Sequence, residues 1–591
     1  MKKITFLLFV LSFSFSFSQT IIEGFIFDRE TKTSLPYATM KIISNNNYYT
    51  ITNEDGKFEV SDKFILDSLE IRFIGFKTKK VAVSYFREKS KFYLTPNTFR
   101  LNQVLVVAKK DKNYTYNLLN NLIKKYRNKQ TITKSKVFLS LTSSARGIPI
   151  ETIEGFYNSK HNVSKGIIDL KLKSGRFGQN ASFPFYSLNN TDILKDFQFF
   201  KKHNQILPLY PGNLSLSAIK GKYLIKIDEC ISCNLEDISI SFMPKKKNGR
   251  LLSGTIIFNK EQLIIKKIIV SGENLITDRL SSIIEDDTVT PKSMLLNINF
   301  NPNDYDKIQS LDFEFKMNYR SKDNFEIITS HSLLYFYDYN TSFNAPYFTN
   351  NINFNNDYDK IRALQASDEF WSLNYQFPKS YKEKMSIDFF KKYGYLINYN
   401  TSIPSEYLQF IRPSIITWQE NKSLKWQDIK LSLLKNKEST IDHKAYKQGA
   451  TKAVDKEAFS ISEFKQKSNK SEIDEQLNFS YMLDAYTNKL GETQFSTKTL
   501  FDRNASFCSY NRINHKLMYI NLIFDVYEIY NRELKTELSK NRSFEEAKIL
   551  CEQKFNEATL IIKKMAADTN KGTSFQNLIR WSEKVKVKLA N

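Results

Sequence analysis

The spacing of apolar residues divides the chain into regions of different secondary structure. Apolar and polar residues alternate in short runs over residues 19–108 and again over residues 131–345, which is the pattern of strands with one buried face. Over residues 477–591 the apolar positions recur at intervals of three and four, as in amphipathic helices. We therefore predict an α+β multidomain protein with an N-terminal β-sandwich, a curved antiparallel β-rich middle domain and an α-helical C-terminal region.

Two connecting segments separate these regions. Residues 109–130 carry one apolar stripe at helical spacing, so we predict a connecting helix that begins after Asp111 or Asn113 and docks the first domain against the second. Residues 435–476 are polar and charged with few large apolar side chains. This composition favours a linker or a mobile loop.

The segment of residues 346–434 is mixed in pattern and rich in aromatic residues. Ser367 or Asp368 is expected to cap a short helix within it. An aromatic cluster of this kind could grip a sugar ring or a partner peptide, but packing in a hydrophobic core is the more common use of such side chains. The cluster comprises Tyr358, Ile361, Leu364, Phe370, Trp371 and Tyr375.

Composition and charge narrow the classes of function. The chain has 591 residues, of which 41% are hydrophobic, so it can build several cores and is not a disordered protein. Its 87 Lys and Arg residues outnumber 63 Asp and Glu residues, which gives a formal charge of +24. The basic residues are mostly lysines spread along every segment. We therefore expect no nucleic-acid partner, because such proteins usually concentrate basic residues in a patch.

The first 18 residues have the features of a secretory signal peptide. A short basic start is followed by an apolar core too short to span a bilayer, and Ser16-Phe17-Ser18 places small residues before a cleavage site at Gln19. No Cys follows the core, so lipid attachment is not expected. No later stretch approaches 18 uninterrupted apolar residues. We predict an exported protein, periplasmic or associated with the outer membrane, that is neither a lipoprotein nor transmembrane and that could associate peripherally with a membrane.

Five short motifs follow one another in residues 19–108. Asp55-Gly56-Lys57-Phe58 is expected to form a turn in which Gly56 can adopt positive φ before a strand resumes. Gly75, in Ile74-Gly75-Phe76, is also expected to lie in a turn. Each motif has a plain structural role, with glycines in turns and apolar residues in a core. The full series is Gly24-Phe25-Ile26-Phe27-Asp28, Leu35-Pro36-Tyr37-Ala38, Asp55-Gly56-Lys57-Phe58, Ile74-Gly75-Phe76 and Leu101-Asn102-Gln103-Val104-Leu105-Val106.

This series resembles the carboxypeptidase regulatory-like domain, a transthyretin-like sandwich found on many exported bacterial proteins and before TonB-dependent outer-membrane transporters. The resemblance implies the sandwich fold, with Asp55, Gly56, Phe58 and Gly75 as the family's turn motif. It implies no active site. The remainder of the chain resembles uncharacterised exported proteins in which this domain precedes a helix and a β-rich region.

The histidines do not predict a peptidase. The metallocarboxypeptidases bind zinc through a His-x-x-Glu pair and a distant His, but none of the five histidines here has Glu three residues later. A His-Glu-x-x-His motif is also absent. We therefore expect no catalytic zinc and no other cofactor.

Cys230 and Cys233 lie between two strand-like runs, residues 222–227 and 238–242. A redox pair would be expected at a junction of strand and helix, whereas a pair at a hairpin tip favours a small structural disulfide in an oxidising compartment. Redox or metal function is the alternative. Cys551 falls on the apolar face of a predicted helix, where a buried thiol is the ordinary outcome.

Two acidic turns offer oxygen atoms that could attract a cation. Asn301, Asn303, Asp304 and Asp306 stand close together in sequence, and Glu285, Asp286 and Asp287 form a second cluster. A calcium site needs six or more converging oxygens, and neither turn has the glycine and terminal glutamate of an EF-hand. Solvated turns are the favoured interpretation, and no metal site is predicted.

The sequence therefore predicts a non-enzymatic, exported envelope protein that acts as an interaction or docking module. An envelope protein is the expected partner, and a lipid or glycan ligand is compatible with the pattern. The alternative is a periplasmic carrier of lipid or another hydrophobic ligand, because the middle sheet is faintly similar to the half-barrels of periplasmic lipoprotein carriers. A carrier would need an open apolar cavity inside that sheet.

Overall fold

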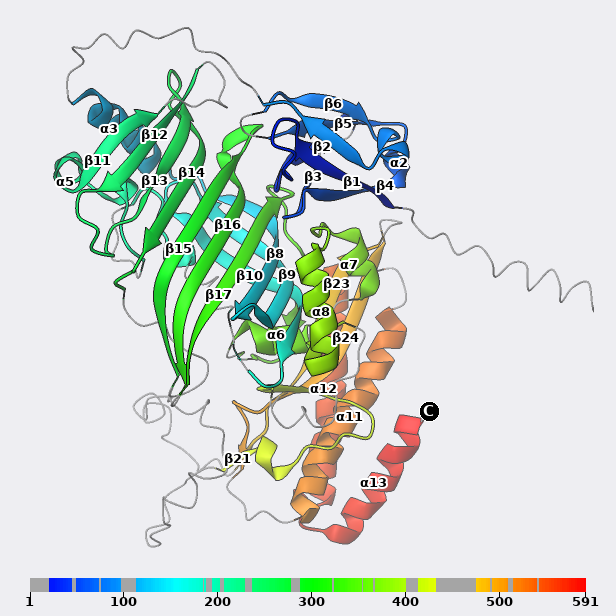
Figure 1. Cartoon of the computed structure of the whole chain (residues 1–591). Coiled ribbons are helices and arrows are strands. Elements are labelled where there is room, and N and C mark those ends of the chain that lie inside the picture. The colour runs from blue at the N-terminus through cyan, green and yellow to red at the C-terminus, as the bar shows by residue number, and fades with distance from the viewer. Residues whose placement is uncertain are drawn as a thin grey trace, which may run out of the picture.

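A computed structural model of the chain contains a small two-sheet domain, a large sheet and a C-terminal helical unit (Figure 1). It describes residues 21–44, 49–73, 76–96, 113–183, 185, 187, 194–201, 207–228, 236–277, 287–321, 324–352, 354, 356–364, 367–399, 413–431, 475–488, 492–508, 514–538 and 542–590. The predicted signal peptide, the predicted linker except for Glu475 and Gln476, and the motif at residues 101–106 lie outside the described residues. No helix among the described residues has the length and apolar character needed to cross a membrane.

The N-terminal domain is the predicted β-sandwich. One sheet has the order β4-β1-β7 and the other β3-β2-β5-β6. Side chains from both sheets, among them Ile26, Met40, Phe58 and Leu69, are buried between them because alternate residues of each strand face inward. The strands are β1 (Ile21–Asp28), β2 (Thr39–Ile42), β3 (Tyr49–Ile51), β4 (Lys57–Ser61), β5 (Ser68–Arg72), β6 (Lys79–Ala82) and β7 (Lys91–Leu94), with a short helix α2 (Tyr85–Glu88).

The middle of the chain forms one antiparallel sheet of 11 strands in the order β11-β12-β13-β14-β15-β16-β17-β8-β9-β10-β19. Most neighbouring strands are joined by short turns, as the alternating pattern predicts. The strands are β8 (Thr133–Ala145), β9 (Ile148–Asn162), β10 (Gly166–Asn180), β11 (Tyr223–Asp228), β12 (Asp237–Pro244), β13 (Ser253–Asn259), β14 (Ile264–Glu273), β15 (Thr288–Asn301), β16 (Asp304–Ser321), β17 (Asn324–Tyr337) and β19 (Gly394–Ile397). Figure 1 shows the longest of them curving along their length.

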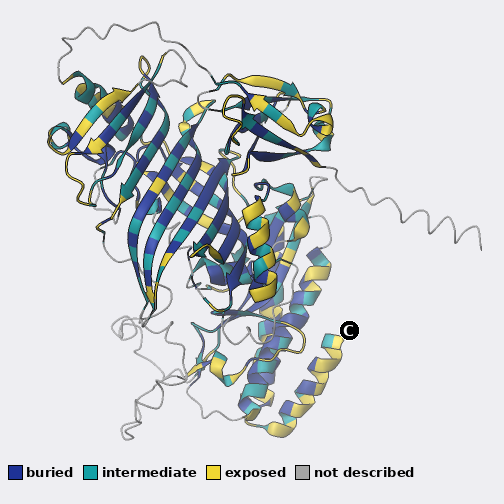
Figure 2. Ribbon diagram, in the orientation of Figure 1, coloured by how far each residue is buried: buried dark blue, intermediate teal, exposed yellow. Residues whose placement is uncertain are grey.

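The two faces of this sheet are covered by different parts of the chain. The inner face, which carries Leu139, Leu296 and Phe313, packs against α3 (Tyr114–Arg127) and against residues 194–201 and 207–222, which include α5 (Leu216–Lys222). The hydroxyl of Tyr126 on α3 accepts a hydrogen bond from the Ile265 amide at 2.8 Å, which ties this helix to β14. The inner face is therefore filled by the protein's own side chains, and the strands alternate between buried and exposed positions in Figure 2.

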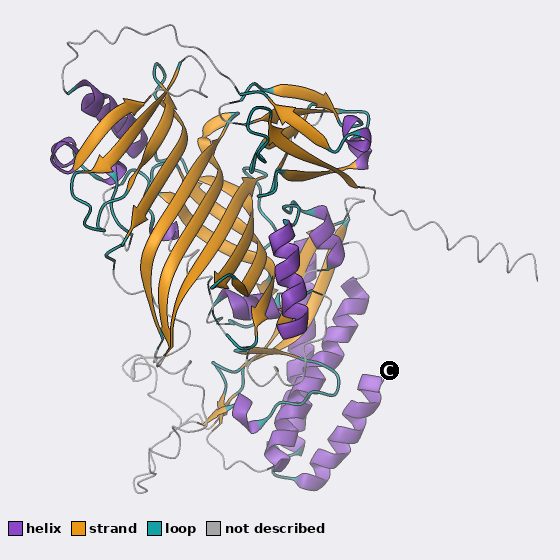
Figure 3. Ribbon diagram, in the orientation of Figure 1, coloured by secondary structure: helices purple, strands orange, loops and turns teal. Residues whose placement is uncertain are grey.

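The outer face carries the N-terminal sandwich and two short helices, α7 and α8 (Figure 3), whereas a third short helix, α6, packs against β10 on the inner side. A separate aromatic core, which includes Phe138, Phe156, Phe370, Trp371 and Phe377, lies on this face at β8 and β9. The aromatic cluster predicted in this segment is thus divided, because Phe370 and Trp371 belong to this core whereas Tyr358 is buried on the inner face. Of the two caps proposed for α7, the side chain of Ser367 accepts the Phe370 amide. The helices are α6 (Asp357–Ala363), α7 (Asp368–Leu373) and α8 (Tyr381–Tyr393).

The C-terminal unit packs three helices against a small sheet of order β18-β23-β24-β20. Ser543 and Glu546, which have the Ser-x-x-Glu spacing of a capping box, form one at the start of α12, and Gly572, with φ of +87°, follows the end of this helix. The elements are β18 (Tyr347–Phe348), β20 (Ile415–Thr417), β21 (Lys430–Leu431), β22 (Glu475–Gln476), β23 (Phe479–Thr487), β24 (Thr493–Asp502), β25 (Phe507–Cys508), α11 (Asn514–Leu538), α12 (Phe544–Asp568) and α13 (Phe575–Ala590).

Three details differ from the sequence-based expectations. The large sheet extends beyond residue 345, because β19 pairs with β10. The region 477–591 begins with the hairpin β23–β24 before its helices. Asn113 occupies the cap position of α3, but its side chain makes no capping hydrogen bond.

Candidate functional site

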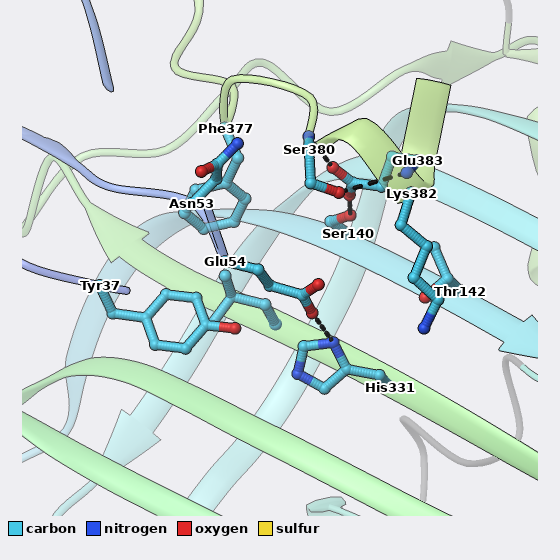
Figure 4. Close-up of a pocket in the computed structure, with 11 residues that line it drawn as sticks. Tyr37, Asn53, Glu54, Ser140, Thr142, His331, Phe377, Ser380, Lys382 and Glu383 are labelled. Atoms are coloured by element: carbon cyan, nitrogen blue, oxygen red, sulfur yellow. Dashed lines mark hydrogen bonds and ion pairs between the residues drawn. The ribbon is translucent and has the colours of Figure 1, made fainter. Parts of the chain in front are cut away.

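A cluster of hydrogen-bonded and charged side chains lies where the sandwich meets the outer face of the sheet. The turn of residues 53–56, here called the docking turn, projects from the sandwich toward β17 and the start of α8 (Figure 4). Gly56 has φ of +74°, and the side-chain oxygen of Asn53 accepts the amides of Asp55 and Lys57, each at 2.9 Å. The Asn53 side chain thus stabilises the conformation of the turn from within the sandwich, because it accepts hydrogen bonds from two of the turn's backbone amides.

Two backbone groups next to the aromatic core hold the docking turn. The Asn53 side-chain amide donates to the Pro378 carbonyl at 3.0 Å. The Asp55 carboxylate accepts the amide of Tyr381 at 2.9 Å. Tyr381 is the first residue of α8, so a negative charge lies at the end of the helix where free amides favour it.

His331 on β17 lies between two carboxylates, and one of them, that of Glu54, belongs to the sandwich. Its Nδ1 lies 2.8 Å from Glu54 Oε1 on the docking turn, and its Nε2 lies 2.6 Å from Asp312 Oδ1 on β16. Burial disfavours the charged ring, but the hydrogen bonds and charges of Asp312 and Glu54 outweigh it and raise the pKa of His331 to about 10. The hydrogen bond from His331 in turn lowers the pKa of Glu54. The ring is therefore an imidazolium between two carboxylates at neutral pH.

The space enclosed at this junction is small. Its volume of about 20 Å³ is enough for roughly one water molecule. Its walls come from the sandwich on one side and from β8, β17 and the start of α8 on the other. The lining residues are Tyr37, Asn53, Glu54, Ser140, Thr142, His331, Leu333, Phe377, Ser380, Lys382 and Glu383 (Figure 4).

The start of α8 is fixed to the sheet beside this cavity. Ser380 and Glu383 form a reciprocal capping box, in which each side chain accepts the other residue's amide. Ser140 on β8 donates to Glu383 Oε1 at 2.7 Å. Burial, together with the negative charge of Glu154, raises the pKa of Glu383. This carboxylate therefore serves the helix start and is surrounded by protein groups.

A buried ion-pair network lies beneath α8 on the same face. Glu154 on β9 contacts Arg176 at 2.6 Å and Lys379 at 2.5 Å, and the guanidinium of Arg176 lies 4.1 Å from the Trp371 ring centroid. Burial raises the pKa of Glu154, but Lys379 and Arg176 outweigh it and lower that pKa to about 2. These groups fix the aromatic core on the sheet.

Glu151, on the inner face of β9, is a buried carboxyl group whose pKa is raised. Burial raises the pKa of Glu151 to about 7, although hydrogen bonds from Ser187, Tyr358 and Gln179 oppose the shift. Both carboxylate oxygens are occupied by these protein donors. General acid or base chemistry would require a reactant in hydrogen-bond reach, and the neighbours of this carboxyl group are the protein's own side chains.

The residues singled out from the sequence are dispersed in the fold. Asp55 and Gly56 lie in the docking turn, whereas Phe58 is buried in the sandwich core with its ring centroid 4.8 Å from that of Phe86. Gly75, Cys230 and Cys233 lie outside the described residues, although the flanking strands β11 and β12 do pair as the predicted hairpin. Of the predicted turn motif, Asp55 and Gly56 therefore lie at the junction with the large sheet, and Phe58 lies in the core of the sandwich.

The other cysteines are buried thiols. Cys508 and Cys551 are buried in the core of the C-terminal unit. Burial raises the pKa of Cys551 to about 12, as expected for a thiol packed on an apolar helix face.

The described acidic turn at β16 forms ion pairs instead of a cation site. Asp304 lies 3.0 Å from Lys307, and Asp306 pairs with Lys129. Across the described residues there is no group of three or more His, Cys, Asp or Glu side chains placed to hold a metal. Glu285 and Asp286 lie outside those residues.

Sequence reasoning missed the cluster of Glu54, Asp312 and His331. Each residue comes from a different strand or turn, and His331 was considered only for a zinc motif. A local signal does exist for the docking turn, because Asn53-Glu54-Asp55-Gly56 is a recognisable turn. Nothing in that tetrad indicates which strand the turn will contact.

Comparison with known proteins identifies the N-terminal domain. Residues 22–106 match the CarboxypepD_reg-like domain family. The sequence-based resemblance is confirmed for this part of the chain. No curated protein matches the sequence.

Solved structures of MucB show a distant likeness. The complex of Pseudomonas aeruginosa MucA/MucB has 8% sequence identity, covers 37% of this chain and 93% of that chain, and has a TM-score of 0.16. A crystal structure of MucB gives the same identity and TM-score with 92% of its chain covered. A TM-score this low does not establish a shared fold.

Proposed function

We propose that this chain is an exported, non-enzymatic envelope protein that acts as an interaction or docking module. The observation that carries the proposal is the junction of the docking turn with β17 and α8. There the polar groups of the CarboxypepD_reg-like domain are used to attach it to the large sheet. The attached domain and sheet together offer a partner one extended surface.

The electrostatics of the described residues support a role without catalysis. The carboxyl groups of Glu151, Glu154 and Glu383 are surrounded by protein donors or cations. A catalytic group needs access to a reacting atom, which these three carboxyl groups lack. The cavity between His331 and the docking turn has room for about one water molecule.

Carriage of a lipid or another hydrophobic ligand inside the sheet is the competing function. It requires an open apolar cavity on the inner face, but α3 and residues 194–201 and 207–222 fill that face with buried side chains such as Phe197, Tyr210 and Leu122. The filled face supports docking over carriage. Mass spectrometry of lipids that co-purify from native envelope would count against the carrier if it found none above the level of a mock purification.

Photo-crosslinking in intact cells tests the docking function. A photoreactive amino acid replaces Phe325 on β17 or Leu66 in the sandwich, which are 50% and 99% exposed. We expect a discrete adduct with an envelope protein from at least one position, and none from the buried control position Leu334. The mature chain should also begin near Gln19. Recovery of the unprocessed chain from the cytosol, or the absence of an adduct at every exposed position tried, would contradict the proposal.

A further inference from the structure

An open groove adjoins the docking junction on the outer face of the sheet. It lies between α8 and the end of the β8–β9 hairpin, and we call it the α8 groove. Its volume is about 460 Å³, within the range of small-molecule binding sites. Thr142, His331 and Lys382 line both this groove and the cavity at the docking turn. The groove is separate from the filled inner face, because Thr142 and His331 are paired across β8 and β17 on the outer side.

The wall contributed by α8 is apolar and open to solvent. Met385 and Tyr393 are 52% and 50% exposed, and Phe389 lies between them on the same wall. The opposite side is formed by Thr142, Thr329 and Pro149. Large apolar side chains that remain exposed along a concave surface favour an apolar ligand.

The charges around the α8 groove favour an anion at one end. Lys392 lies at the end near Tyr393 and is exposed, and Lys382 lies at the other end. The carboxylate of Asp388 is paired with Lys391 at 2.9 Å. At the Lys382 end, the two carboxylates of Glu54 and Asp312 exceed the single positive charge of His331, which disfavours an anion there. Lys392 is therefore the better position for a ligand's negative group.

We propose that the α8 groove binds a single-chain fatty acid, with its hydrocarbon chain along Met385 and Phe389 and its carboxylate at Lys392. The volume of about 460 Å³ lies near the lower end of the range for ligand sites, about 300 to 1,000 Å³, which favours a ligand with one acyl chain over a phospholipid with two. Dodecanoate is a soluble ligand of this kind.

Titration calorimetry of the full mature chain with dodecanoate, below the concentration at which micelles form, tests this site. We expect saturable binding of one molecule and weaker binding of dodecanol, which lacks the charge. Lys392→Gln should weaken dodecanoate binding about two- to five-fold and leave dodecanol binding unchanged. Met385→Ala should weaken both ligands about three- to ten-fold, because it removes apolar contact. Lys384→Gln is the matched control, since Lys384 is exposed on α8 but does not line the groove.

Filling the groove provides a second test. Thr329→Trp places a large side chain on the strand that forms the groove wall, and dodecanoate binding should be lost while circular dichroism and the melting temperature stay close to those of the wild type. Undiminished binding to a folded Thr329→Trp variant would overturn the assignment. So would equal affinity for dodecanol and dodecanoate, or the absence of binding by the wild type. Failure of the fatty-acid site is distinguishable from failure of the docking function, because the docking function is tested separately by crosslinking from Phe325 and Leu66.

Discussion

Replacing His331 with Gln tests the charge that joins the sandwich to the sheet. A pKa raised from 6.5 to about 10 corresponds to a ceiling of about 5 kcal/mol, at about 1.4 kcal/mol for each unit. The Glu54 side chain is 43% exposed, so solvent screens part of this energy, and we expect a loss of about 2 to 3 kcal/mol. Because the folded-state pKa is raised, the stabilisation is complete below pH 6.5 and disappears as the pH rises through 10.

The assay is hydrogen exchange of the segments around the docking turn and α8, measured in increasing urea at pH 6 and at pH 10. His331→Gln should lower the free energy of opening of this junction by about 2 to 3 kcal/mol at pH 6 and by less than about 1 kcal/mol at pH 10. His515→Gln, the same change on α11, should have little effect at either pH. An equal loss at both pH values, or no loss at pH 6, would refute the electrostatic explanation.

Three further predictions concern stability and the thiols. Lys173→Met leaves the buried carboxylate of Asp484 without the cation that it contacts, and it should lower the free energy of unfolding by about 3 to 5 kcal/mol in urea titrations. The control Lys171→Met replaces a side chain that is 73% exposed and should lower the free energy of unfolding by less than about 0.5 kcal/mol. Gly56→Ala should destabilise the protein by about 1 to 3 kcal/mol, because φ is positive there and the added Cβ would lie 2.6 Å from the Ile26 carbonyl oxygen. Gly147 also has positive φ, but a Cβ there would have no atom within 4 Å. A calorimetric melting temperature that falls equally for Gly56→Ala and Gly147→Ala would therefore disprove the clash. Non-reducing peptide mapping should find Cys230 linked to Cys233, and free thiols at these positions would reject the disulfide.

The fold was largely predictable because its main signals are local. Alternation identified the strands of the large sheet, since one face of each strand is buried against the core. The capping box at Ser543 and the turn at Gly56 were visible for the same reason. β19 was missed because its four residues are too few to show a pattern, and it pairs with β10, which is distant in sequence.

The junction was not predictable because its signals are not local. Glu54, Asp312 and His331 are brought together only when the sandwich docks on the sheet. Each is an ordinary polar residue in a turn or on the face of a strand. The α8 groove has the same origin, since its two walls come from a helix and a hairpin that are far apart in sequence.

The central structural claim is that the sandwich and the large sheet move as one body. Pulsed electron resonance between spin labels on unnatural amino acids at Leu66 in the sandwich and Met243 on β12, both exposed, measures this directly. We predict a single narrow distance distribution that broadens when Asn53 and His331 are both replaced by Ala. A broad distribution in the otherwise unaltered protein would contradict the claim.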